Sequence, residues 1–171
     1  MKLIEPNIIY KNTYLDMMEE WRSSGEEYVP FTLEFDTSDF EKFIRYTNSF
    51  KTVNPAGFVH HSTFWLINDD EEIAGVSNLR HYLNEKLLTE GGHIGFGIRP
   101  SLRRKGYASK LLELTLLEAK KLDITKVLLT CDKSNTGSSK TIQKNNGILW
   151  KEQILKGVLK QYYWIQISLL L

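Results

Sequence analysis

A basic turn near the middle of the chain combines residue types that suit the binding of a phosphate group. It consists of six consecutive residues, Arg103, Arg104, Lys105, Gly106, Tyr107 and Ala108. Gly106 carries no side chain, so the backbone can approach a ligand closely there. The first N–H groups of a helix have no partner within it, which makes a helix that starts at such a turn suitable for binding phosphate. The turn therefore predicts a phosphate site.

Two elements must hold this turn in place. Residues 93–98 alternate between large apolar side chains and small or polar ones, which is typical of a strand, and Pro100 ends that strand. From Ala108 to Leu122 the apolar residues recur at helical spacing, with Lys and Glu on the opposite face. The sequence thus predicts a strand, the basic turn and an amphipathic helix in succession.

A second polar block follows a strand expected at residues 126–131. It contains Asn135 and Ser138 and leads into a short helix that reaches Gly147. This block and the R-x-x-G-x-A run from Arg103 to Ala108 resemble the signature of the GNAT-type N-acetyltransferase superfamily. The resemblance extends over roughly residues 60–165 and includes the order of strands and helices.

The resemblance implies acetyl-CoA as co-substrate. In that superfamily the amides of the turn hold the coenzyme A pyrophosphate, an Asn after the later strand helps to hold it, and a strand N–H stabilises the oxyanion formed at the thioester. Carried onto this chain, the cofactor-binding residues would be Gly97, Ile98, Arg103, Arg104, Lys105, Gly106, Tyr107, Ala108, Asn135 and Ser138. The implied reaction is acetyl transfer to a primary amine by direct attack in a ternary complex.

A general base would help such a reaction, because an alkylammonium with a pKa of about 10.4 is mostly protonated at neutral pH. The candidates are His93, which shares a strand face with Gly95 and Gly97, and then Glu90, Glu85 and His81. Each has an alternative interpretation, since the carboxylates could be solvated and the histidines could be hydrogen-bonded in or near the core.

The leaving thiolate poses a separate question. Many members of the superfamily have a Tyr, seven residues after the Asn, that can protonate it, and here that position is Ile142. A tyrosine acid is therefore not predicted, and a water proton could serve instead. The departure also keeps a different class of function open, a non-catalytic module that binds or senses acyl-CoA.

The acceptor would be recognised by segments outside the cofactor motif. The resemblance assigns this role to the loop after the first helix and to the final hairpin, whose candidate residues are Glu26, Glu27, Tyr28, Phe31 and Tyr162. Carboxylates beside aromatic rings suit a cationic amine, either a small amine or the Lys or N-terminal amine of a peptide. A solvated acidic loop is the alternative.

Composition limits the remaining possibilities. The chain has 171 residues, 42% hydrophobic and 25% charged, with a net charge of +1. These values predict one globular domain over residues 1–171, with no broad nucleic-acid surface and no membrane span. Cys131 is the only cysteine, and no metal-ligand pattern is present. We expect a cytoplasmic protein and allow for a homodimer.

The remaining pattern predicts the order of elements. We expect a first strand within residues 3–10, helices around residues 14–21 and 40–48, and strands at 64–67 and 73–83. The segment 84–92 is expected to link to the central strand, and two strands at 149–155 and 158–168 complete the chain. The fold class is α+β, a twisted and mostly antiparallel mixed sheet flanked by helices, with a parallel strand pair around the acetyl-CoA site.

Overall fold

The strands form two antiparallel sheets in the computed structural model, which describes residues 1–54 and 57–167. The first sheet has the order β1 (Lys2–Ile4), β2 (His61–Ile67), β3 (Ile73–Arg80) and β4 (Ile94–Ile98). The second has the order β5 (Lys126–Asp132), β7 (Val158–Gln166) and β6 (Ile148–Leu155).

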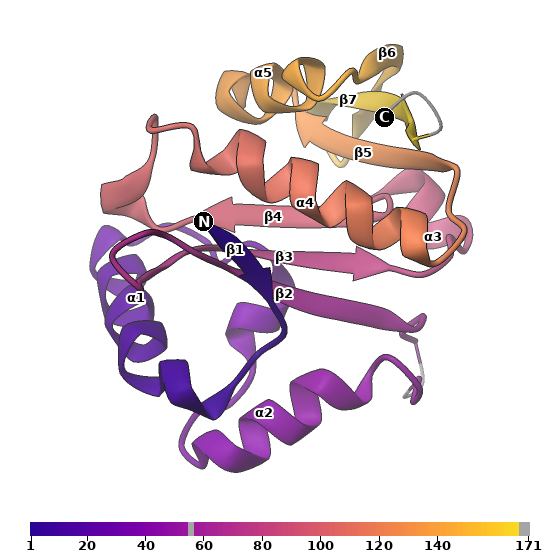
Figure 1. Cartoon of the computed structure of the whole chain (residues 1–171). Helices are drawn as coiled ribbons and strands as arrows, with labels where there is room; N and C mark the ends of the chain where they lie inside the picture. The colour runs from indigo at the N-terminus through magenta and orange to yellow at the C-terminus, as the bar shows by residue number, and fades with distance from the viewer. Residues whose placement is uncertain (55–56, 168–171) are drawn as a thin grey trace.

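The helices cover both faces of the first sheet and one face of the second (Figure 1). They are α1 (Lys11–Ser24), α2 (Phe40–Ser49), α3 (Glu85–Thr89), α4 (Tyr107–Lys121) and α5 (Thr136–Lys144), with short 3-10 turns η1 (Ile8–Tyr10), η2 (Phe31–Glu34) and η3 (Pro100–Leu102). The predicted fold class is confirmed.

Strand alternation explains why the first sheet can be covered on both sides. Trp65 and Ile67 of β2 pack with α1 and α2, whereas Leu66, between them, packs with Leu111 of α4. Successive side chains of a strand point to opposite faces, so a continuous apolar run gives two cores. One core therefore anchors α1 and the loop of residues 25–30 that follows it, and the other anchors the helix that begins at the basic turn.

Backbone and side-chain hydrogen bonds join the start of β4 to β5. In Figure 1, β4 and β5 run in the same direction, as expected of a parallel pair. The N–H of His93 donates to the carbonyl of Leu128 at 2.8 Å, and the N–H of Leu128 donates to Nδ1 of His93 at 3.0 Å. The side chain of His93 thus takes an N–H that a ladder would use. The described residues of β4 and β5 form no parallel ladder, and the expected single mixed sheet is divided in two.

Several boundaries differ from the sequence prediction. The first strand ends at Ile4, and the rest of its expected range contains η1. Helix α2 begins at Phe40, and Asp39 caps it by accepting from the N–H of Lys42 at 3.0 Å. The link 84–92 contains α3, which Asn84 caps. The last strand ends at Gln166, and residue 168 lies outside the described residues.

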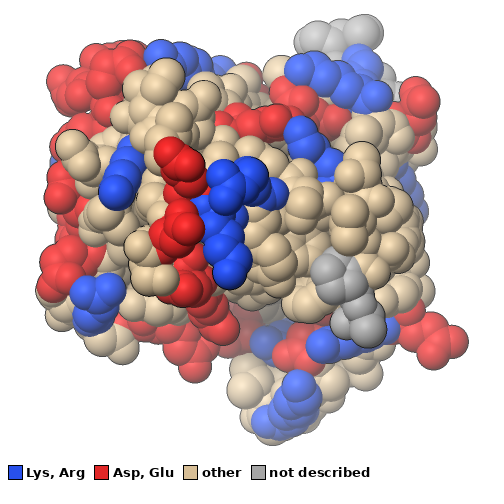
Figure 2. Space-filling view, turned by 90° about the horizontal axis from the view of Figure 1, so that it is seen from below, with Lys and Arg blue, Asp and Glu red and all other residues tan. Residues whose placement is uncertain are grey.

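Surface charge is mixed on the face seen in Figure 2. Lys and Arg lie among Asp and Glu there and form no continuous blue field on that side of the molecule. None of the helices among the described residues is both long and apolar enough to cross a membrane.

Candidate active site

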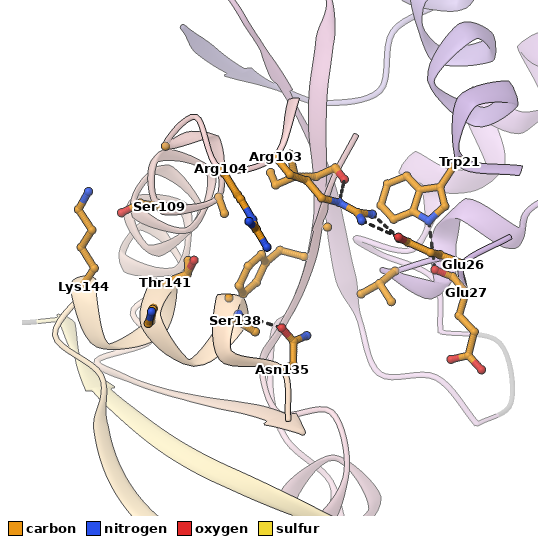
Figure 3. Close-up of a pocket in the computed structure, with 18 residues that line it drawn as sticks. Trp21, Glu26, Glu27, Arg103, Arg104, Ser109, Asn135, Ser138, Thr141 and Lys144 are labelled. Carbon is orange, nitrogen blue, oxygen red and sulfur yellow. Dashed lines mark hydrogen bonds and ion pairs between the residues drawn. The ribbon is translucent and has the colours of Figure 1, made fainter. Parts of the chain in front are cut away.

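A cavity of about 580 Å³ lies beside the second half of β4 and the starts of α4 and α5. Its walls come from the β4 edge, the start of α4, the start of α5 and the loop after α1 (Figure 3). Most of the residues expected to bind the cofactor line it, namely Gly97, Ile98, Arg103, Arg104, Gly106, Ala108, Asn135 and Ser138. The structure thus brings two distant segments of the sequence motif together around one space.

The basic turn presents an open helix start to this cavity. Gly106 is the N-cap of α4 with φ of 88°, and no side chain caps the helix. A side chain there would be strained by the positive φ but would meet no atom within 4 Å. The first N–H groups of α4 are therefore free for a ligand. Lys105 is exposed and Tyr107 packs with the core around Leu111, so neither lines the cavity.

The β4 edge contributes unpaired backbone groups. The carbonyl of His93 accepts from Arg80, and the N–H of Arg99 donates to Ala74, so the backbone groups of residues 95 and 97 between them face β3, whereas the N–H of His93 already turns to Leu128 of β5. Alternate residues point to the opposite edge. The N–H groups of Phe96 and Ile98 therefore face the gap that separates β4 from β5.

Helix α5 closes the cavity on the other side. Asn135 is its N-cap, and its Oδ1 accepts from the N–H of Ser138 at 3.0 Å. Lys140, Thr141 and Lys144 of this helix also line the cavity, together with Ser109 of α4. All four residues were missed in the sequence, although the spacing of Lys144 from Thr141 and from Lys140, three and four residues along α5, was an available signal.

The loop after α1 supplies the fourth wall. Glu26 and Glu27 line the cavity as expected, and Trp21 and Val29 join them. Arg103 donates to both carboxylate oxygens of Glu26, at 2.8 and 2.5 Å, and this hydrogen bonding lowers the pKa of Glu26. The indole N–H of Trp21 donates to the carbonyl of Glu27 at 3.1 Å, which fixes the start of the loop. Two carboxylates of this loop therefore line the same cavity as the basic turn, and Glu26 is paired with Arg103 of that turn.

Three expected acceptor residues lie elsewhere. Tyr28 lines a neighbouring cavity and packs against the α1 core. Phe31 belongs to an aromatic cluster with Phe35 and Phe58. Tyr162 is fully buried, and its hydroxyl donates to the carbonyl of Thr89 at 2.6 Å. None of the three lines the main cavity, so the geometry assigns them packing roles.

The four candidate bases also lie outside the cavity lining. His93 is 7% exposed and its Nδ1 accepts from Leu128, while burial, reinforced by Arg80, lowers its pKa to about 4. His81 bonds the hydroxyl of Ser62 at 2.8 Å, and burial lowers its pKa. Glu90 pairs with Lys156 at 2.9 Å, and Glu85 is exposed in the first turn of α3. The geometry therefore favours the structural alternative for each histidine and the solvated one for the carboxylates.

The position where many superfamily members have a tyrosine acid is occupied by Ile142. Ile142 is fully buried in the core. The hydroxyl of Tyr163 is also buried and shared with Ser139 at 2.8 Å and Gln161 at 2.9 Å. Cys131 is buried too, which raises the pKa of its thiol to about 11. The thiol is therefore poorly suited to act as a nucleophile.

Metal chemistry receives no support from the side-chain arrangement. Among residues 1–54 and 57–167, no group of three or more His, Cys, Asp and Glu side chains is placed to hold a metal ion.

Solved structures with the same fold include a mutant spermidine N-acetyltransferase from Vibrio cholerae. It is 14% identical with a TM-score of 0.66, and the match covers 98% of this chain and 96% of that chain. A Salmonella typhimurium acetyl transferase that modifies the N-terminal serine of ribosomal protein L7/L12 is also 14% identical, with a TM-score of 0.66 and coverage of 96% and 93%.

A further Salmonella typhimurium protein, described as an acetyltransferase and solved with its cofactor acetyl-CoA, is 10% identical with a TM-score of 0.64 and coverage of 97% and 93%. At such identities the likeness shows the fold, and no curated protein matches the sequence. The sequence model of the acetyltransferase (GNAT) family matches residues 15–148, which include the basic turn and Asn135. The match spans most of the chain, and the chain therefore belongs to the acetyltransferase (GNAT) family.

Proposed function

We propose that this protein transfers the acetyl group of acetyl-CoA to a primary amine. The observation that carries the proposal is the meeting of the open α4 start, the capped α5 start and the free β4 edge around one cavity. The α4 start suits a pyrophosphate and the strand edge suits an extended amide-containing arm. Arg104, Lys140 and Lys144 add positive charge to the same walls.

The chain's part in the chemistry is mainly electrostatic. The N–H of Phe96 or Ile98 would donate to the thioester oxygen as the amine nitrogen bonds to the carbonyl carbon and charge builds on that oxygen. When the C–S bond breaks, the thiolate takes a proton from water, since Ile142 offers none. Transfer is direct, because Cys131 is buried with a raised pKa and lies outside the cavity lining.

The amine must lose its proton before it attacks. No histidine lines the cavity, and both Glu26 and Glu27 belong to its acceptor side. We propose that water removes the proton and that the carboxylates hold the protonated form nearby. The value of kcat/KM should then rise by about tenfold per pH unit below the pKa of the amine, without a plateau near neutral pH.

The acceptor is proposed to be a cationic amine. Glu26, Glu27 and the ring of Trp21 suit ammonium recognition by charge and by cation–π contact. Among the similar structures, one enzyme is a spermidine N-acetyltransferase and another modifies a protein N-terminus. Both acceptor classes, small amines and peptide amines, therefore belong in the test.

A thiol-release assay over a panel of amines tests the function. We expect CoA release that depends on both acetyl-CoA and one class of amine. Binding of acetyl-CoA with no release on any acceptor would instead favour the alternative, a non-catalytic acyl-CoA-binding module.

Location and assembly are further proposals. A cytoplasmic location fits acetyl-CoA as co-substrate. A homodimer is proposed because β6, an edge strand of the second sheet, exposes Ile148, Trp150 and Ile154. One similar structure is a dodecameric spermidine N-acetyltransferase from Vibrio cholerae. Sedimentation equilibrium at increasing protein concentration should give the mass of a dimer, and a mass that stays at the monomer value would contradict the proposal.

A further inference from the structure

Arg103 connects the phosphate turn to the acceptor loop. Its Nε donates to the carbonyl of Ile98 at 3.1 Å, and its two terminal nitrogens donate to the two oxygens of Glu26. The guanidinium also lies 5.7 Å from the ring centre of Trp21. Figure 3 shows this side chain directed across the cavity from the turn to the loop.

Arg103 and Glu26 lie between the two proposed ligand sites, so each ligand would attract one member of the pair. It lines the main cavity and also the neighbouring cavity of the acceptor loop. On one side, a pyrophosphate at the turn would attract Arg103. On the other, an ammonium group would attract Glu26. The two N–H groups that Arg103 directs at Glu26 cannot also be directed at a pyrophosphate, and the carboxylate lone pairs that accept from them are not available to an ammonium.

The exposure of the pair makes it exchangeable. The Arg103 and Glu26 side chains are 38% and 48% exposed. By contrast, the nearby pair of Arg99 and Glu20 is 15% and 26% exposed, and Glu20 also accepts from the N–H of Ser101. Exposed ion pairs are weak because water competes for both partners. The Arg103–Glu26 pair can therefore exchange its partners for ligands. The Arg99–Glu20 pair instead holds the segment between β4 and the basic turn to α1.

We propose that the Arg103–Glu26 pair couples the two ligand sites by exchange. Coenzyme A draws Arg103 toward its phosphates and releases Glu26, which then takes the ammonium of the acceptor. Each ligand removes the competitor of the other, so binding of one strengthens binding of the other by the same factor. The inference rests on the proposed acetyl-CoA site and adds Glu26 as the residue that senses its occupancy.

Calorimetric titration with CoA tests the exchange without a known acceptor. Glu26→Gln frees Arg103 and should tighten CoA binding by about two- to fivefold, the range that one exposed ion pair can supply. Glu27→Gln is the matched control, because it removes the same charge from the same cavity wall without touching Arg103. Glu27→Gln should change the affinity for CoA less than Glu26→Gln does.

A double-mutant cycle separates exchange from general charge effects. In an Arg103→Gln background, Glu26→Gln should no longer tighten CoA binding. A complementary titration uses propylammonium as the probe, which should strengthen CoA binding to the wild-type protein and not to Glu26→Gln.

The possible outcomes distinguish failure of the Arg103–Glu26 exchange from failure of the acetyl-CoA site itself. Equal effects of Glu26→Gln and Glu27→Gln, or an effect that persists without Arg103, would overturn the exchange and leave the acetyl-CoA site standing. A wild-type protein that gives no binding isotherm with CoA would remove the proposed function and the exchange together.

Discussion

His93 illustrates how one residue type can serve structure where chemistry was expected. The ring joins the two sheets by accepting the N–H of Leu128, and the same contact keeps it away from the cavity lining. A neutral imidazole with one acceptor nitrogen is what this hydrogen bond requires. Its low pKa therefore has a consequence for stability.

Acidification should weaken the fold through His93. Its pKa is lowered from 6.5 to about 4 by burial, so the unfolded chain binds the proton more readily than the folded one. Stability is full above pH 6.5 and is lost as pH falls toward 4, by up to about 3 kcal/mol. Urea unfolding at stepped pH would measure this. His93→Gln should reduce the pH slope, and an unchanged slope would assign it to other groups such as His61.

Gly106 allows a second prediction at the scale of a residue. Gly106→Trp should abolish or strongly weaken CoA binding in calorimetry, because the ring would occupy the mouth of the open helix start. Gly157→Trp is the matched control, since Gly157 also has a positive φ, 81°, and open space around it. Both variants should lose stability by about 1 kcal/mol from backbone strain. Equal CoA affinities of the two variants would exclude the turn as the phosphate site.

Two helices contribute their N-terminal ends to the cavity. Helices α4 and α5 both direct their N-termini at it, and one is uncapped while the other is capped by Asn135. Two such ends favour an anion, because each adds partial positive charge. Because α4 has no capping side chain, a cap can be tested by substitution only at α5, where Asn135 supplies it.

Asn135 should have separable roles in α5 and in the cavity. Asn135→Ala removes the cap and should cost about 1 kcal/mol of unfolding free energy. Asn135→Asp keeps a capping oxygen and should retain stability, yet it places a negative charge on the cavity wall and should weaken CoA binding. Thermal unfolding and calorimetry on both variants would measure the two roles. Normal CoA affinity in Asn135→Asp would mean that the residue only caps the helix.

At the scale of the whole molecule, the division into two sheets creates the site. Hydrogen bonds between His93 and Leu128 join the start of β4 to β5, and beyond them no strand among residues 1–54 and 57–167 pairs with that edge of β4. A continuous ladder would have filled that space with backbone hydrogen bonds.

Hydrogen exchange should detect this free edge. The amides of Phe96 and Ile98 face the gap, whereas that of Gly97 faces β3. In the free protein, Phe96 and Ile98 should exchange faster than Gly97, and saturating CoA should slow at least one of them. NMR-detected exchange would resolve the three amides. If CoA binds without slowing either edge amide, the ligand does not run along β4.

Local patterns were sufficient for the main elements and for the motif. The alternation around Phe96 predicted β4, the helical spacing after Ala108 predicted α4, and the polar block predicted an Asn at the start of α5. These signals depend on neighbours in the chain, so the sequence carries them directly. The short helix α3 was missed because five residues give too little periodicity, although Asn84 was a capping signal.

The order of residues along the chain was enough to predict the family resemblance, the fold class and most of the residues of the basic turn and the α5 start that line the cavity. Which polar residues face the cavity and which face the core became clear from the folded arrangement alone. His93 and Tyr162 became packing residues, while Lys140 and Lys144 gained a place on the cavity wall. The reason is physical: the direction of a side chain across sheets and helices depends on contacts between segments far apart in the chain, such as Arg103 with Glu26, and local sequence does not encode them.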